Sequence, residues 1–145
     1  MKRDLEIRLI QNEDEYNKIL TLRRIVFVRE QNVPPKIEFD GLDKESTHII
    51  VKLGKEMIGC ARIRSFNGKI KLERIAILKE YRSQGFGKRL IQYLLYYSKQ
   101  GNAKEIIVHA QYHMKSFYEE FGFKTRGKTF REAGIKHIEM YEAKM

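Results

Sequence analysis

Two glycines one residue apart, Gly85 and Gly87, separate an apolar, β-rich run (residues 70–78) from an amphipathic helical pattern. Glycine permits a tight turn in which several backbone N–H groups point into one concavity. The helix that follows adds its own unpaired N–H groups and the positive end of its dipole at the same place. The pattern therefore predicts a strand–turn–helix unit that binds a phosphate or pyrophosphate.

Two common phosphate-binding motifs do not fit this spacing. The dinucleotide fingerprint requires a third glycine three residues after Gly87, where Leu90 stands. A Walker A loop requires glycine at the position of Arg82 and Ser or Thr at that of Arg89. What is left is Arg82-x-x-Gly85-x-Gly87, for which a plain strand-to-helix turn is the simpler alternative.

The size and composition are those of one globular domain. We expect a single domain over residues 1–145, with 42% apolar and 33% charged residues. No stretch approaches the roughly twenty apolar residues of a membrane span, and the N-terminus lacks an apolar signal region. The single cysteine, Cys60, excludes an internal disulfide framework and lies in an apolar run. We therefore expect a cytoplasmic protein without membrane contacts, in which Cys60 is a buried hydrophobic residue.

The net charge of +10 arises from 29 basic and 19 acidic residues, which are dispersed through every segment. Nucleic-acid binding surfaces usually gather their basic residues on one face or tail. A dispersed excess instead indicates a general bias, with a local contribution from Arg82, Lys88 and Arg89 around the glycine turn. Dedicated nucleic-acid binding is therefore not favoured.

The hydrophobic periodicity predicts an alternation of strands and helices without a linker or repeat. Strands are expected at residues 5–10, 48–53, 56–64, 70–78, 105–111, 125–130 and 136–142. Helices are expected at residues 12–28, which Asn12 caps, at 87–101 and at 114–121; the segment 31–44 is expected to be a loop with at most one short helix. This order predicts an α/β domain with a mixed sheet.

The residues around the turn resemble the GNAT (general N-acetyltransferase) superfamily. The Arg82-x-x-Gly85-x-Gly87 turn resembles its acetyl-coenzyme A (acetyl-CoA) loop, and residues 72–77 look like the strand before that loop. Phe117-Tyr118-x-x-x-Gly122-Phe123 is similar to its Phe-Tyr-x-x-x-Gly-Phe segment. Further matches indicate the ElaA-like subgroup. The resemblance implies a single-domain fold whose mixed, mostly antiparallel, twisted sheet is flanked by helices and splayed between the central strands.

The resemblance also implies an activity, namely transfer of the acetyl group of acetyl-CoA to a primary amine, directly in a ternary complex. A strand N–H near Ile75 would stabilise the oxyanion. The residues implied in coenzyme binding are Ile75, Ala76, Ile77, Arg82, Ser83, Gln84, Gly85, Phe86, Gly87, Lys88, Gln111 and Tyr118.

Two residues are candidates for catalysis. Tyr118 is the candidate general acid for the leaving thiolate, although its place on an apolar helical stripe also fits a core aromatic. Glu73 is a candidate for the group that deprotonates the amine, and the direction of its side chain depends on whether its strand bulges. The acceptor wall is expected to include Glu30, Glu38, Asp40 and His113, and each carboxylate alone also fits a solvated surface residue.

Several questions are left open by the sequence. His109 and His113 lack a Glu or Cys at ligand spacing, so no metal is expected and His109 is interpreted as a strand-packing residue. The acceptor could be a small-molecule or peptide amine, and the family resemblance is compatible with a homodimer. The alternative function is a non-catalytic module that binds CoA or nucleic acid on the same scaffold.

Overall fold

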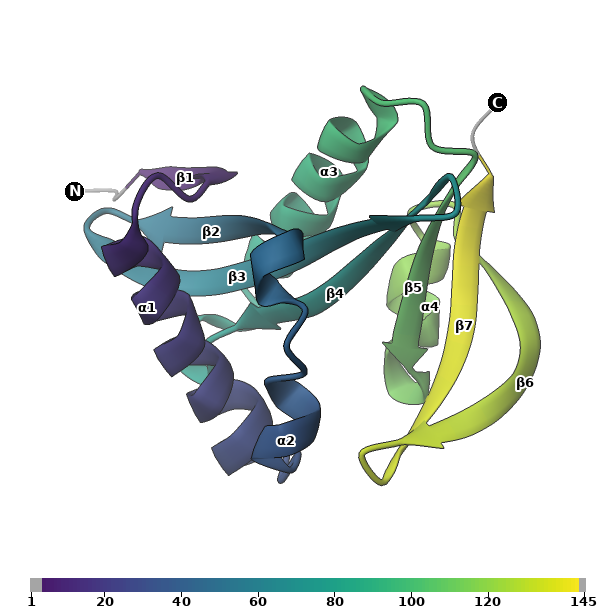
Figure 1. Cartoon of the computed structure of the whole chain (residues 1–145), viewed down its shortest axis with the longest axis horizontal. Helices are drawn as coiled ribbons and strands as arrows, with labels where there is room; N and C mark the ends of the chain where they lie inside the picture. The colour runs from purple at the N-terminus through teal and green to yellow at the C-terminus, as the bar shows by residue number, and fades with distance from the viewer. Residues whose placement is uncertain (1–3, 144–145) are drawn as a thin grey trace.

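The computed structural model describes residues 4–143, which form one seven-stranded sheet with helices on both faces (Figure 1). The strands in chain order are β1 (Leu5–Leu9), β2 (Thr47–Leu53), β3 (Glu56–Phe66), β4 (Lys69–Ile77), β5 (Glu105–Gln111), β6 (Lys124–Glu132) and β7 (Ile135–Ala143). Their order across the sheet is β1-β2-β3-β4-β5-β7-β6.

The helical segments include two long helices and several short turns. In chain order they are α1 (Glu13–Arg23), the π-helical η1 (Arg24–Glu30), α2 (Pro35–Glu38), the 3₁₀ turns η2 (Asp43–Glu45) and η3 (Lys79–Tyr81), α3 (Phe86–Lys99), the 3₁₀ turn η4 (Tyr112–Met114) and α4 (Lys115–Glu119). The glycine turn lies between η3 and α3.

The sheet divides between its central strands, β4 and β5, which run parallel while the other neighbours pair antiparallel. The β4–β5 ladder joins Lys69–Leu72 to Glu105–Val108 and ends there. Beyond it, β4 continues beside β3 and β5 continues beside β7, so two arms diverge (Figure 1). We call this opening the fork. The splayed, mixed sheet expected from the sequence is therefore confirmed.

A bulge in β4 occurs just past the point where the strands part. The register between β3 and β4 shifts at Cys60/Arg62, and Arg74 adopts a φ of +53°. A left-handed conformation is unfavourable for a residue with a side chain, so neighbouring contacts must hold it. The Arg74 guanidinium donates hydrogen bonds to the carbonyls of Ile37 and Glu38 at 3.1 and 3.0 Å. These contacts fix the bulge against the α2 segment.

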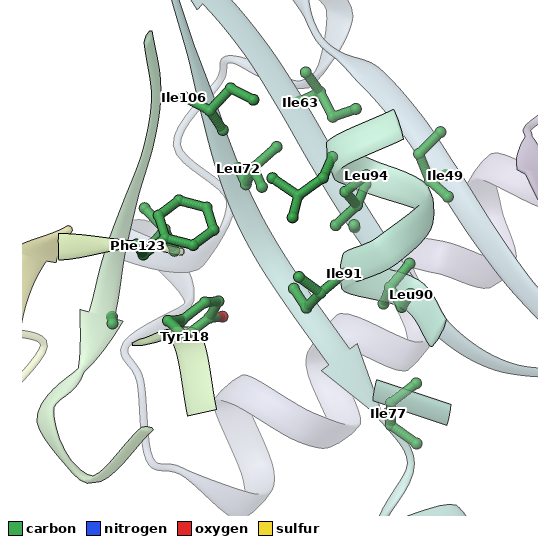
Figure 2. Packing of buried hydrophobic residues seen from close by; sticks show 14 of the residues in the cluster. Ile49, Ile63, Leu72, Ile77, Leu90, Ile91, Leu94, Ile106, Tyr118 and Phe123 are labelled. Carbon is green, nitrogen blue, oxygen red and sulfur yellow. The ribbon is translucent and has the colours of Figure 1, made fainter. Parts of the chain in front are cut away.

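Two apolar clusters lie on opposite faces of the sheet. Helices α3 and α4 cover one face, where Leu90, Ile91 and Leu94 pack against Leu72 and neighbouring strand residues (Figure 2). Helix α1 and η1 cover the other face, with Ile19, Leu22, Val26 and Phe27 against Ile50, Cys60 and Ala76. Cys60 is fully buried and has no disulfide partner, as expected for a small core residue.

The structure confirms the seven predicted strands, whose ends differ from the expected ones by at most two residues. Asn12 caps α1 as predicted, since its Oδ1 accepts the N–H of Glu15 at 2.9 Å. The first predicted helix is wrong in its second half, because regular α-helix stops at Arg23 and a π-helical segment continues to Glu30. The segment 31–44 contains α2 and also the start of η2, one short helical turn more than expected.

Gly59 on β3 gives a test of this packing. A Cβ at position 59 would lie 2.7 Å from the Ala76 carbonyl oxygen and 3.3 Å from the Val51 Cβ. We expect Gly59→Ala to reduce the free energy of unfolding by about 1–3 kcal/mol, because strand backbone cannot move aside easily. Urea denaturation measures the change. Gly101→Ala, where the nearest atom is 4.0 Å away, is the control, and equal effects at both sites would contradict the packing described.

Candidate active site

The glycine turn forms an open concavity at the N-terminus of α3. Gly85 caps the helix with a φ of +86°, and Ser83 before it has a φ of +64°. The Arg89 N–H bonds the Gly85 carbonyl at 3.2 Å, and the amides of the first helical turn precede it. A Cβ at Gly85 would meet no atom within 4 Å, and one at Gly87 only Phe117 Cζ at 4.0 Å. The turn therefore has room for an anion against its amides.

Arg82 links the glycine turn to two neighbouring segments. Its Nε donates to the Ile77 carbonyl at 2.8 Å, at the end of β4. The guanidinium also forms a two-pronged ion pair with Glu30, one arm of which measures 2.9 Å, and this pair lowers the pKa of Glu30. Arg82 thus links the β4 end to η1. In this structure it balances a carboxylate, whereas Lys88 on the other side of the turn is exposed.

The fork brings the expected coenzyme residues of β4 beside the turn. Within the described residues, the β4–β5 ladder ends at Leu72, so Ile75, Ala76 and Ile77 have no β5 partner. Such an unpaired edge can accept an extended ligand as an added strand. Gln111, at the end of β5, instead bonds across the molecule, with its Nε2 donating to Gln31 Oε1 at 2.8 Å.

Tyr118 lies on the α3/α4 face of the fork. Its side chain is 7% exposed and packs edge-to-face against Phe117 and Phe123. Its hydroxyl points away from Phe123 and toward β4 (Figure 2). Burial raises the pKa of this phenol above its usual value, so the group keeps its proton at physiological pH. The structure therefore places Tyr118 as a buried aromatic residue that carries a protonated hydroxyl, and the role of general acid stays a prediction.

Glu73 lies on the opposite face, beside three cations. Its carboxylate receives Arg64 Nε at 2.7 Å, Arg62 at 3.0 Å and Lys71 Nζ at 3.2 Å. Burial alone would raise the pKa of Glu73, but the Arg64 hydrogen bond and the charges of Arg62 and Lys71 lower it to about 2. Such a carboxylate is a weak base.

The other carboxylates expected on the acceptor wall are also paired with arginines. Glu38 is 3% exposed and binds Arg23 at 2.8 Å and Arg74 at 3.0 Å. Asp40 accepts two bonds from Arg62 at 2.9 Å, which help to hold the pKa of Asp40 well below its usual range although burial acts in the opposite direction. The charge of these groups is therefore already balanced by the protein.

Sequence reasoning missed the two arginines at the centre of this network. The Arg62 side chain is 0% exposed and bridges Asp40, Asp43 and Glu73, while Arg23 is 1% exposed and also binds Asp43 at 2.8 Å. Arg62 is a charged residue within the apolar run of β3, and this position is a signal that could have revealed the network. Buried guanidinium groups are almost always paired, so a carboxylate cluster was to be expected around Arg62.

A second polar cluster, also missed, lies on the β5–β7 arm. His109 is half-buried between Glu139 and Glu132, and His137 approaches Glu132 with Nε2 at 3.6 Å. His109 does contact the ring of Phe130, as the packing interpretation expected. His113, expected near the acceptor, is exposed on η4. The alternation of side chains along β5 is a signal that could have revealed this cluster, because His109 faces away from its apolar neighbours Val108 and Ala110.

Two further properties of the described residues bear on function. Within residues 4–143, no group of three or more His, Cys, Asp or Glu side chains is arranged to hold a metal ion. No helix in the same range is both long and apolar enough to cross a bilayer.

Comparison with known proteins identifies the family. Residues 26–143 match the family described as "Acetyltransferase (GNAT) domain". The chain is 38% identical over 133 residues to the Bacillus subtilis protein named "Uncharacterized N-acetyltransferase YjcF". The match covers 91% of this chain and 95% of that protein. The crystal structure of Escherichia coli ElaA has a TM-score of 0.85 at 26% identity, covering 95% of this chain and 99% of that one.

A third similarity concerns the fold alone. A Bacillus subtilis acetyltransferase, solved in complex with CoA, has a TM-score of 0.75 at 18% identity and covers 98% of this chain and 100% of that one. The family match spans most of the chain, and the splayed, mixed sheet agrees with the solved structures of this fold. The protein therefore belongs to the GNAT family of acetyltransferases.

Proposed function

We propose that the protein is an acetyl-CoA-dependent N-acetyltransferase that acts on a primary amine by direct transfer in a ternary complex. The observation that supports this proposal is the fork, where the β4 edge beyond Leu72 is unpaired and the Tyr118 hydroxyl points toward β4 (Figure 2). The glycine turn follows the end of that strand. Family membership supports acetyl transfer in general, and the CoA complex of the Bacillus subtilis relative supports the choice of donor.

The turn and the β4 edge are suited to hold the donor. Backbone amides of residues 84–88 would bind the pyrophosphate, with Lys88 adding a positive charge. The backbone of Ile75 and Ile77 would pair with the pantetheine arm as a further strand. The Ile75 N–H, just past the bulge, would then donate to the developing oxyanion of the acetyl group.

Tyr118 would supply the proton that the departing thiolate needs. Its pKa is raised by burial, so the phenol is protonated before the C–S bond breaks and can act as the acid. The alternative route, an acetyl-cysteine intermediate, finds no support. Cys60 is fully buried, and burial raises the pKa of its thiol to about 12, so the reactive thiolate is scarce. This contrast favours direct transfer.

The acceptor class stays broad in this proposal. Glu30, Glu38, Asp40 and Glu73 all face arginine or lysine partners, so they do not present a strongly acidic surface to a cationic substrate. Small-molecule amines and peptide amines both fit. The buried reduced Cys60 suits the cytoplasmic location that we include in the proposal.

Gly85 tests donor binding. Acetyl-CoA at about 100 times its Kd should stabilise the wild-type protein by about 2.7 kcal/mol, seen as a rise in Tm. Gly85→Glu should abolish that rise, because it places a carboxylate beside the pyrophosphate site. Gly85→Ala is the matched control, since it carries the same backbone cost of about 1–2 kcal/mol without the charge. An unchanged Tm for the wild type at saturating acetyl-CoA would overturn the proposed donor.

Tyr118 tests the chemical step. We expect Tyr118→Phe to lower kcat by about 10²- to 10⁴-fold with little change in the KM for acetyl-CoA, because only the acid is removed. Release of free thiol measures turnover, with ethanolamine, spermidine, a peptide with a free N-terminus and a peptide with only a lysine amine as acceptors. Binding of acetyl-CoA without turnover of any amine by the wild type would instead indicate a CoA-binding module.

A further inference from the structure

The fork has a second face, opposite Tyr118, on which two strands bring polar side chains together. Leu72 and Val108 form the last β4–β5 pair, and both face the α3/α4 cluster. The next residues along these strands are Glu73 and His109, which alternation places on the other face. Both therefore flank the point where the strands part. An amine that attacks a thioester held at Ile75 would have to enter near them.

The hydrogen bonds of His109 fix which ring nitrogen can accept a proton. Its Nε2 lies 3.0 Å from Glu139 Oε1, and a carboxylate can only accept, so Nε2 carries the hydrogen. Glu139 is itself held by Arg126 Nε at 2.7 Å, and Arg126 binds Glu105 at 2.8 Å. In the neutral imidazole the lone pair is consequently on Nδ1.

Nδ1 faces Glu132. It lies 4.0 Å from Glu132 Oε1 and is a buried nitrogen that makes no hydrogen bond in the structure. The Glu132 side chain is 45% exposed, and its other ionic partner is His137 at 3.6 Å. Among the ion pairs of residues 4–143, Glu132 has no arginine or lysine partner, in contrast to Glu30, Glu38, Asp40 and Glu73. It is thus a partly exposed carboxylate beside an unused imidazole nitrogen.

We propose that Glu132 and His109 together remove the proton from the acceptor ammonium. The inference rests on the proposed transferase function and names the base of that same site. Glu132 contacts the ammonium and takes one proton, which passes to Nδ1 of His109, and the imidazolium is held between Glu132 and Glu139. The free amine forms the C–N bond, and breaking of the C–S bond releases the thiolate. The amine nitrogen gives its second proton to the Glu132 carboxylate, and Tyr118 protonates the sulfur. Glu132 and His109 then release their two protons to solvent, and one proton from solvent restores the Tyr118 phenol, so one proton is released per turnover.

The charges around His109 agree with this role. The carboxylates of Glu132 and Glu139 raise the pKa of His109, although burial and the Lys71 ammonium on β4 oppose them. The other groups on this side are His137 on β7, Arg126 on β6, which binds Glu139, and Glu73 beside Lys71. A base gains strength as its pKa rises toward the operating pH, so His109 is the group that keeps the proton. The pKa of Glu132 is lowered, chiefly by His109, so this carboxylate only passes the proton on. Glu73, with a pKa of about 2, has no such imidazole behind it.

Glu139→Gln tests the geometry without relying on turnover. Loss of this carboxylate should lower the pKa of His109, followed by NMR titration of the imidazole nitrogens. Glu105→Gln is the matched control, because it removes the other carboxylate bound to Arg126 but does not contact His109. If both variants leave the imidazole titration unchanged, the arrangement of His109 between carboxylates is wrong and the proposal fails.

Kinetics then test the chemical role, with the fastest acceptor of the amine panel. Removal of the base in His109→Gln should lower kcat/KM by about 10²- to 10⁴-fold while the acetyl-CoA Tm rise persists. In Glu139→Gln the acidic limb of the kcat/KM profile should move to lower pH, because a weaker base loses its proton sooner; Glu105→Gln should match the wild type. An active wild type whose acidic limb is unmoved by Glu139→Gln overturns this inference alone. A wild type that acetylates no amine overturns the proposed function itself.

Discussion

A buried network of guanidinium groups and carboxylates supports the β3–β4 arm of the fork. A parallel sheet normally keeps its central strands paired, because separation leaves backbone N–H and C=O groups without partners. Here β4 leaves β5 after Leu72, and buried ion pairs of Arg62 and Arg23 join the β3–β4 arm to α1 and residues 38–43. Their partners are Asp40, Asp43, Glu38 and Glu73. Loss of one partner in such a network typically costs about 3–5 kcal/mol, since an unpaired charge is left buried. The network therefore holds the β3–β4 arm against α1 and residues 38–43.

The two faces of the fork differ in chemistry. The α3/α4 face is apolar and carries Tyr118, whose hydroxyl is directed toward β4 (Figure 2). The opposite face carries a balanced set of charges on the β3–β4 arm and the half-exposed Glu132 beside His109 on the other arm. A reaction that needs an acid for one leaving group and a base for one nucleophile gains from such a separation, because the pKa values of the two sites are set independently.

The order of elements and the glycine turn could be predicted from the sequence because both depend on local patterns. Alternation and glycine spacing located the strands and the start of α3 closely. The π-helical η1 could not be predicted, because its hydrogen bonding depends on packing of Val26 and Phe27 against the sheet. The partners of Arg82, Glu38 and Asp40 were equally inaccessible, since they join segments tens of residues apart that only the folded chain brings together.

The central claim is that the fork receives the pantetheine arm while the glycine turn binds the pyrophosphate. A crystal structure with acetyl-CoA bound tests it most directly. The account predicts the pantetheine paired with Ile75 and Ile77, the diphosphate against the amides of residues 84–88, and the thioester oxygen within hydrogen-bonding distance of the Ile75 N–H. Donor density elsewhere on the surface, with the fork closed by side chains, would contradict it.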